Sequence, residues 1–187
     1  MRALDRFLQR WRITKVLPFI PFGARVLDIG CGDGALFHLL GNHIREGIGL
    51  DPTLSSHVQG QNFELIPGNF PDALTETEPF DVITMLAVLE HIPEPELHSF
   101  ADNCVFRLKP GGLLIITTPS PHADYILNIL MALRLIDGMS LMEHYGFNPQ
   151  QIHTIFSMPS LNLVKSVKFQ MYFNNLFIFQ KVNNKTI

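Results

Sequence analysis

The sequence has little cysteine and carries no strong excess of charge of either sign. Cys31 and Cys104 are the two cysteines among 187 residues, and their separation predicts neither a disulfide framework nor a metal site. The eight histidines form no H-x-H, H-x-x-x-H or H-E-x-x-H spacing, so we expect no metal. The net charge is -3 and no segment reads as a lysine/arginine stripe, which disfavours a nucleic-acid partner.

Long apolar runs are also lacking. The longest, Tyr125–Leu133 and Leu113–Ile116, are too short to cross a bilayer. Arginines and an aspartate interrupt the apolar residues of the first twelve positions, unlike a signal peptide. We therefore expect a cytoplasmic protein whose contact with a membrane is at most peripheral.

What the sequence does contain is a regular alternation of apolar runs and amphipathic stretches. The chain is 47% hydrophobic and 17% charged, as expected for one folded domain with a substantial core. Apolar runs bounded by glycine, aspartate or proline predict five buried parallel strands, at Arg25–Ile29, Gly47–Asp51, Phe63–Ile66, Phe80–Met85 and Leu113–Thr117.

Helices are predicted between these strands and before them. Ala35–Leu40 follows a glycine-rich loop, and Pro95–Leu108 has apolar residues at helical spacing. Residues 1–22 predict a helical cover that precedes the main domain at 23–187, with Leu4, Phe7, Leu8 and Trp11 on one side of the helix. This helix has two interpretations, a pocket cover or a peripheral membrane contact.

The last third of the chain departs from the strand–helix rhythm. Leu163–Phe169 and Leu176–Val182 predict strands joined by a short turn around Asn174-Asn175, so they must be antiparallel. A helical insert rich in large aliphatic residues is predicted at about 121–145. The insert either packs on the edge of the sheet or forms a lid over an apolar pocket, with Met131, Met139 and Met142 as an adaptable wall.

The most informative segment is the loop Asp28-Ile29-Gly30-Cys31-Gly32-Asp33-Gly34. Its glycines allow a ligand to approach the backbone at the carboxyl end of the sheet. A dinucleotide-binding loop follows G-x-G-x-x-G, whereas this loop follows G-x-G-x-G and carries two carboxylates that would repel a pyrophosphate. The charges favour a ligand with an ammonium and a sulfonium, and they disfavour an NAD-type oxidoreductase. Asp51, at the end of the second strand, can accept hydrogen bonds from ribose hydroxyls.

With these motifs in place, the chain resembles the class I S-adenosylmethionine-dependent methyltransferases, in the branch that contains many small-molecule enzymes. The resemblance is strongest over about residues 24–118. It rests on five motifs at the family's spacing, namely Asp28 to Gly34, Gly49 to Pro52, Gly68-Asn69-Phe70, Phe80 through Ile92, and Lys109 to Gly112. It implies an α/β, Rossmann-like, seven-stranded and mostly parallel sheet in the order 3-2-1-4-5-7-6, with strand 7 antiparallel and helices on both faces.

The resemblance also implies a cofactor site for S-adenosylmethionine, with S-adenosylhomocysteine as product. The glycines of the loop would approach the methionine part, Asp51 would hold the ribose, and Asn69 and Phe70 would lie beside the adenine. Asparagine replaces the commoner aspartate at position 69. The residues expected to bind the cofactor are Asp28, Gly30, Cys31, Gly32, Gly34, Asp51, Pro52, Asn69, Phe70, Met85 and Leu86.

A small-molecule acceptor, apolar or lipid-like, is the expected methyl recipient. A hydroxyl acceptor would need a base, and His91 at the exit of strand four is the candidate, although it can equally brace the local turn. His122 and His144 flank the insert and can equally be surface residues. The segment Met85-Leu86-Ala87-Val88 lacks the Asn/Asp-Pro-Pro-aromatic motif of nucleobase methyltransferases. The alternative function is a non-catalytic module that binds the cofactor and supports a partner. The oligomeric state and the atom methylated are left open.

Overall fold

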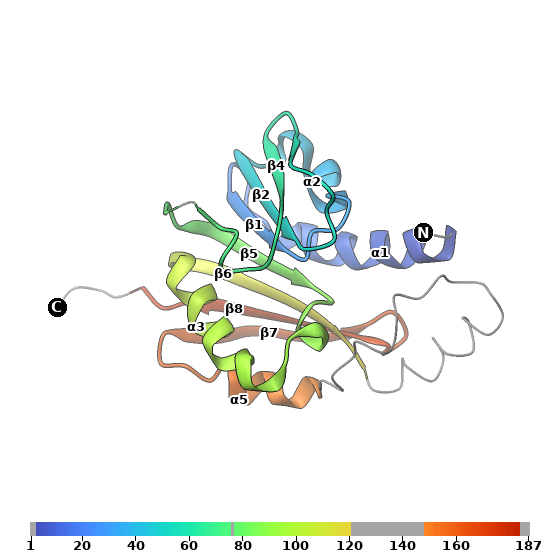
Figure 1. Ribbon diagram of the computed structural model, residues 1–187. Coiled ribbons are helices and arrows are strands. Elements are labelled where there is room, and N and C mark those ends of the chain that lie inside the picture. The colour runs from blue at the N-terminus through green and yellow to red at the C-terminus, as the bar shows by residue number, and fades with distance from the viewer. Residues whose placement is uncertain (1–2, 76, 121–147, 184–187) are drawn as a thin grey trace.

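A computed structural model of the protein describes residues 3–75, 77–120 and 148–183. The predicted insert at 121–145, with His122, His144 and the three methionines named above, lies outside the described residues. The described chain forms one mixed sheet with helices against it (Figure 1).

The sheet has eight strands in the order β3-β4-β2-β1-β5-β6-β8-β7. Their bounds are β1 Arg25–Ile29, β2 Glu46–Asp51, β3 Val58–Gln59, β4 Phe63–Pro67, β5 Phe80–Leu86, β6 Leu108–Pro119, β7 Leu161–Phe169 and β8 Asn174–Lys181. Neighbours from β4 to β6 run parallel, and β8 is antiparallel to both β6 and β7. The predicted order 3-2-1-4-5-7-6 is therefore confirmed.

The eighth strand is an addition to the predicted seven. β3 pairs antiparallel with β4 through Val58 and Gln59. Residues 52–62 form turns and this short strand, with no helix among them. The short hairpin of β3 and β4 thus forms this edge of the sheet.

Helices cover both faces of the sheet, as predicted. α1 (Ala3–Val16) and α2 (Ala35–Leu40) pack on one face, while α3 (Leu97–Arg107) and α5 (Ile152–Ile155) pack on the other (Figure 1). The alternation of side chains along each strand supplies both layers. In β1, for example, Val26 belongs to the core on the α1 and α2 side and Leu27 to the core on the α3 and α5 side.

The face that α1 buries differs from the predicted one. Its most buried residues are Ile13 and Val16, followed by Ile20 just after the helix, whereas Phe7 is 58% exposed. The helix ends in a short 3-10 turn at Leu17–Phe19. The sequence shows two apolar groups along this helix, and the carboxyl-terminal one is the group that docks on the sheet.

The turn of the carboxyl-terminal hairpin also lies elsewhere than predicted. Asn174 and Asn175 begin β8, where they pair in register with Pro119 and Thr118, and both are buried. The reversal instead uses Gln170, Met171 and Tyr172, whose φ angles are 49°, 53° and 70°. Asparagine is typical of turns because it tolerates this left-handed region. Here the tertiary hydrogen bonds of the two asparagines outweigh that preference.

Charged side chains at the amino-terminal edge of the parallel strands form a connected network. The Arg25 side chain is 1% exposed, donates from Nε to Glu46 Oε2 at 2.7 Å, and lies 4.3 Å above the centre of the Phe80 ring. Its Nη1 also donates to the carbonyl of Glu78. Lys109 pairs with Asp81 at 2.9 Å beside it. The buried and half-buried charges named here are thus paired with partners at the same edge.

Candidate cofactor site

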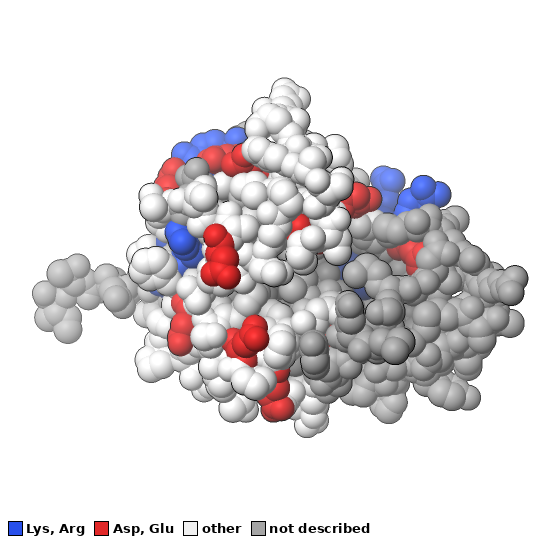
Figure 2. Space-filling model, viewed as in Figure 1, with Lys and Arg blue, Asp and Glu red and all other residues white. Residues whose placement is uncertain are grey.

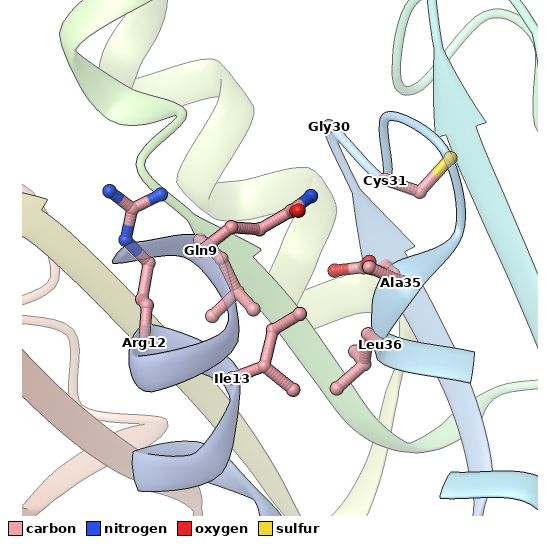
Figure 3. Close-up of a pocket in the computed structure, with 9 residues that line it drawn as sticks. Gln9, Arg12, Ile13, Gly30, Cys31, Ala35 and Leu36 are labelled. Atoms are coloured by element: carbon pink, nitrogen blue, oxygen red, sulfur yellow. The ribbon is translucent and has the colours of Figure 1, made fainter. Parts of the chain in front are cut away.

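A small cavity lies at the carboxyl-terminal edge, between α1 and the loop that follows β1. Its volume is about 60 Å3. Side chains of α1 approach it from one side and the glycine loop and the start of α2 from the other (Figure 3). The lining residues are Gln9, Arg12, Ile13, Asp28, Gly30, Cys31, Ala35, Leu36 and Leu86.

The shape of the loop depends on glycine at two positions in particular. Gly30 has a φ of +73°, and a Cβ there would lie 2.4 Å from Cγ2 of Val88. Gly34 has a φ of +72° and caps the start of α2. L-residues with side chains rarely adopt this region of φ, so the loop can hold its path beside the cavity only with glycine. The predicted roles of Gly30 and Gly34 in shaping this loop have this physical basis.

Asp28 places a carboxyl group in the wall of the cavity. The residue is 3% exposed, and its Oδ1 accepts a hydrogen bond of 2.6 Å from Thr84 Oγ1 on the neighbouring strand. Burial raises the pKa of Asp28 to about 7, and the nearby Asp51 carboxylate acts in the same direction against the hydrogen bond from Thr84. A cationic group in the cavity would favour the charged form of Asp28.

Asp51 connects the end of β2 to the glycine loop. Its Oδ2 accepts from the backbone N–H of Gly32 at 2.8 Å, and its Oδ1 accepts from the N–H and hydroxyl of Thr53 at 2.8 and 2.6 Å. A carboxylate offers about four acceptor positions. Three of these positions are occupied, so Asp51 can accept a hydrogen bond from one ribose hydroxyl directly, and from a second one if the Thr53 hydroxyl gives up its bond.

The sequence offered a pocket cover as one of two interpretations of α1 but did not indicate which of its residues line the cavity. Gln9 Nε2 donates to Asp33 Oδ1 at 3.1 Å, which ties α1 to the glycine loop. Arg12 lines the cavity, and its Nε is buried without a hydrogen-bond partner in the part of the chain that the structure describes. Burial lowers the pKa of Arg12, and the carboxylate of Glu90 partly opposes that shift. A cation placed among helix residues of mixed polarity gave no pattern that sequence reasoning could use.

The remaining predicted cofactor residues fall into different surroundings. Leu86 lines the cavity, whereas Met85 is 0% exposed and packs in the core on the α3 side. Phe70 is also buried, and its ring meets Phe100 edge-on at 5.1 Å. Pro52 and Asn69 are exposed. Of this group, only Leu86 joins the loop residues around the cavity.

His91 lies just after β5, at the end of a short 3-10 helix over Leu89–His91. It is half-buried, and its backbone N–H donates to Val88 at 2.9 Å. The neighbouring Glu90 is only 4% exposed. The segment just after β5 therefore carries a histidine and a buried carboxylate, close in sequence to Leu86 at the end of that strand.

Two buried hydroxyl groups follow on the next strand. Thr117 pairs with Leu86 in register, and Thr118 follows it; both are 0% exposed. Within the described residues neither side-chain oxygen has a hydrogen-bond partner, and the same holds for Oδ1 of Asn174 on β8. Buried polar atoms are nearly always paired in folded proteins, so such a group at one edge indicates a site for polar ligand atoms.

The cysteines have no reactive character. Cys31 and Cys104 are buried free thiols, and burial raises the pKa of each well above its ordinary range. A thiol that stays protonated is a poor nucleophile and a poor metal ligand. Cys31 instead packs against β2, where a Cβ on Gly49 would lie 2.7 Å from its Sγ.

Other kinds of site are not found in the described part of the chain. Residues 3–75, 77–120 and 148–183 contain no group of three or more histidine, cysteine or acidic residues able to hold a metal ion. Within these ranges no helix has the length and apolar character needed to cross a membrane. On the visible described surface, basic residues form no continuous stripe (Figure 2).

Comparison with known proteins gives one family match over most of the chain. The family described as "Methyltransferase domain" matches residues 2–164. The ubiquinone biosynthesis O-methyltransferase of Glaesserella parasuis serovar 5 (strain SH0165) is 34% identical over 125 residues, which are 59% of this chain and 52% of that protein. The enzyme of the same name from Xylella fastidiosa (strain 9a5c) is 38% identical over 116 residues, 57% of this chain and 45% of that protein. The matched region thus spans about half the length of these relatives.

Solved structures share the fold over nearly the whole chain. The N-methyltransferase NodS from Bradyrhizobium japonicum WM9, in complex with S-adenosyl-L-homocysteine, has a TM-score of 0.66 at 18% identity and covers 96% of this chain and 88% of its own. A complex of the Haloferax volcanii Trm112 methyltransferase activator with a methyltransferase gives 0.69 at 12% identity, covering 98% and 99%. At these identities the likeness establishes the fold alone.

Proposed function

The chain belongs to the class I S-adenosylmethionine-dependent methyltransferases, and we propose that it transfers the methyl group of that cofactor to a small, largely apolar acceptor. The observation that carries this proposal is the acidic glycine loop closed by Arg12 of α1. The cavity there presents groups of both charges, which suits a zwitterionic amino-acid moiety and does not suit a pyrophosphate.

The residues around the cavity fit the parts of this cofactor. The Arg12 guanidinium, with its buried and unpartnered Nε, would hold the methionine carboxylate. Asp28, at the opposite wall, would hold the ammonium group as a carboxylate. Asp51 would accept hydrogen bonds from the ribose, and Asn69, exposed beyond β4, would meet the adenine. Met85 and Phe70 would support the site from the core rather than contact the cofactor.

When bound, S-adenosylmethionine supplies an activated methyl group, so this chain need only align the acceptor and exclude water. Gln9 and Ile13 of α1 line the cavity and would help to exclude water from it. For a hydroxyl acceptor, His91 would take up the proton as the methyl group is transferred to oxygen. Its position just after β5, the strand that contributes Leu86 to the cavity, supports this role.

An apolar or lipid-like acceptor is favoured by two observations. The relatives named above are ubiquinone biosynthesis O-methyltransferases by name. The sequence at about 121–145 carries many large aliphatic residues directly after β6, at the edge of the sheet where the cavity lies. A small polar acceptor would not call for such a segment.

The test measures S-adenosylhomocysteine formed by the full chain with S-adenosylmethionine and a panel of acceptors. We expect turnover with phenols or catechols that carry an apolar tail, and none with highly charged acids. His91→Gln should lower kcat by about 100-fold. Asp51→Ala should weaken cofactor binding by about tenfold or more in a calorimetric titration.

Two outcomes of this test would contradict the proposal. Binding of S-adenosylhomocysteine without turnover on any acceptor would favour the alternative, a non-catalytic cofactor-binding module. Tight binding of NAD in place of S-adenosylmethionine would overturn the assignment of the site itself.

A further inference from the structure

The side chain of Gln170 joins the carboxyl-terminal hairpin to α1. Gln170 is 5% exposed, and its Nε2 donates a hydrogen bond of 2.9 Å to the backbone carbonyl of Leu8, 162 residues away in the sequence. Its Oε1 accepts from Nδ2 of Asn174. Both ends of this amide are therefore committed, one of them to the helix that covers the cavity.

The backbone that presents Gln170 is strained. Gln170, Met171 and Tyr172 have successive φ angles of 49°, 53° and 70°, and none of them is glycine. Residues with a side chain rarely adopt this region, and three in a row are retained only where the surroundings demand them. A turn that served only to reverse the chain would be easier to build with glycine.

The hydrogen bonds that hold this turn in place come from Ser120, just after β6. Ser120 Oγ donates to the carbonyl of Tyr172 at 2.6 Å, and its backbone N–H donates to the carbonyl of Phe173 at 2.8 Å. Asn175 Nδ2 reaches Ser120 Oγ at 3.3 Å from the first residues of β8. The turn is thus attached to the sheet, and the side chain of Gln170 links it to α1 by a hydrogen bond.

On the other side, α1 is fastened to the glycine loop. Leu8, which Gln170 binds, immediately precedes Gln9, and Gln9 donates to Asp33. Arg12 lies one helical turn after Leu8 and lines the cavity. The helix is therefore held at two neighbouring positions, by the glycine loop at Gln9 and by the strained turn at Leu8.

We propose that Gln170 is a positioning residue: by holding Leu8 it sets the rotation and depth of α1, and so directs Arg12 at the cofactor carboxylate. This inference rests on the proposed function, because it takes Arg12 as a cofactor contact. It assigns the hairpin, which lies far from the glycine loop in the sequence, a part in cofactor binding.

The informative variant is Gln170→Gly, because it separates the two roles that the residue can have. Glycine removes the amide but relieves the strain of the positive φ. If the position matters for the turn alone, glycine should keep both stability and affinity. If Gln170 positions α1, the thermal midpoint should be kept or raised while the affinity for S-adenosylhomocysteine falls about fivefold, the effect of about one lost hydrogen bond.

A second variant and a matched control complete the set. Gln170→Asn keeps an amide and a residue tolerant of left-handed backbone but is one methylene too short to reach Leu8, so it should lose affinity as the glycine variant does. Gln180→Ala is the control. Gln180 lies on β8, the strand that follows the turn, and it donates to the carbonyl of Gly111 at 3.1 Å, far from the cavity. It should leave cofactor affinity unchanged.

The second readout is amide hydrogen exchange without ligand, which does not depend on turnover. Gln170→Gly should raise exchange across residues 3–16 and leave β1 and β2 unchanged. In a double-mutant cycle, Gln170→Gly should have little further effect on affinity when Arg12 is already alanine.

The possible failures are distinguishable. If the native protein does not bind S-adenosylhomocysteine, the proposed function fails. If Arg12→Ala weakens binding and Gln170→Gly does not, the positioning role of Gln170 is wrong. Additive losses in the cycle would also refute it, since Gln170 would then act by a route that does not pass through Arg12.

Discussion

The two edges of the parallel strands treat buried charge in opposite ways. At the amino-terminal edge, Arg25 is almost fully buried but meets a carboxylate, a carbonyl and an aromatic ring. At the carboxyl-terminal edge, Asp28 is also deeply buried and accepts a hydrogen bond from a threonine hydroxyl, while the side-chain oxygens of Thr117 and Thr118 have no hydrogen-bond partner among the described residues.

This difference shows where binding capacity is kept. Saturating buried polar groups stabilises a fold, whereas leaving them unsaturated costs stability unless a ligand completes them. The amino-terminal edge therefore serves the fold, and the carboxyl-terminal edge keeps groups of both charges for a ligand. Substitutions at the amino-terminal edge should therefore change stability, and substitutions at the carboxyl-terminal edge should change binding.

Removing the buried cation at the amino-terminal edge should have the largest effect. Arg25→Ala leaves its partners without a donor and opens space beneath Phe80, which should lower the free energy of unfolding by about 3 kcal/mol. Urea denaturation measures this loss. Binding of S-adenosylhomocysteine to the folded fraction should not change. The matched control is Arg45→Ala, whose side chain is 54% exposed and which should cost little. Equal losses for both variants would mean that burial does not decide the effect.

The carboxyl-terminal edge should respond to Asp28→Asn in the opposite direction. Because the folded-state pKa of Asp28 is raised to about 7, the unfolded chain ionises first as the pH increases, and native stability falls between about pH 4 and pH 7. Asparagine removes this loss. The variant should be more stable at pH 8 by on the order of 2 kcal/mol and equal to the native protein near pH 3.5.

The same substitution should weaken cofactor binding, because the ammonium group loses its carboxylate partner. In the native protein the affinity for S-adenosylmethionine should rise from pH 6 to pH 8, because Asp28 loses its proton to the solvent and then pairs as a carboxylate with the cationic ligand. Calorimetry in buffers of different ionisation enthalpy would detect the released proton. An equally steep pH dependence in Asp28→Asn would assign the effect to another group.

A pair of threonines gives a smaller and sharper test of saturation. Thr84 donates to Asp28 at 2.6 Å, whereas the Thr117 hydroxyl has no partner. Thr84→Val should therefore destabilise the protein by about 1 kcal/mol, and Thr117→Val should be neutral or slightly stabilising. Thermal denaturation of the two variants side by side measures the difference. If Thr117→Val costs as much as Thr84→Val, the carboxyl-terminal edge is saturated by contacts of another kind.

The smallest effect should come from the exposed part of the amino-terminal network. Lys109 and Asp81 are 31% and 35% exposed. Burial alone would raise the pKa of Asp81, but the hydrogen bond from the Arg25 N–H and the Lys109 ion pair outweigh it and lower the pKa. Lys109→Met should cost about 0.5 kcal/mol at low salt and less at 1 M salt. A loss that does not depend on salt would indicate packing rather than charge.

Much of the framework could be predicted from the sequence, because the relevant physics is local. Apolar runs of four to six residues between turn formers predicted the strands β1, β2, β4 and β5 to within a residue or two. The spacing and charge of the glycine loop predicted a binding site for a cationic ligand, and the structure places Asp28, Gly30 and Cys31 in the lining of a small cavity there. These features depend on side-chain alternation, φ preference and the sign of charge, all of which a single segment carries.

The contribution of α1 and of the hairpin turn was decided by the tertiary structure. Helical periodicity shows that α1 has apolar groups, but not that Ile13 and Val16 would dock while Phe7 stays exposed, nor that Gln9 and Arg12 would face the glycine loop. Asn174 and Asn175 suit a turn by local preference, yet buried pairing with β6 draws them into β8 and moves the strained reversal to Gln170. In both cases the free energy comes from contacts between segments that are distant in the sequence, 24 residues for Gln9 and Asp33 and 57 for Thr118 and Asn175, which no local pattern records.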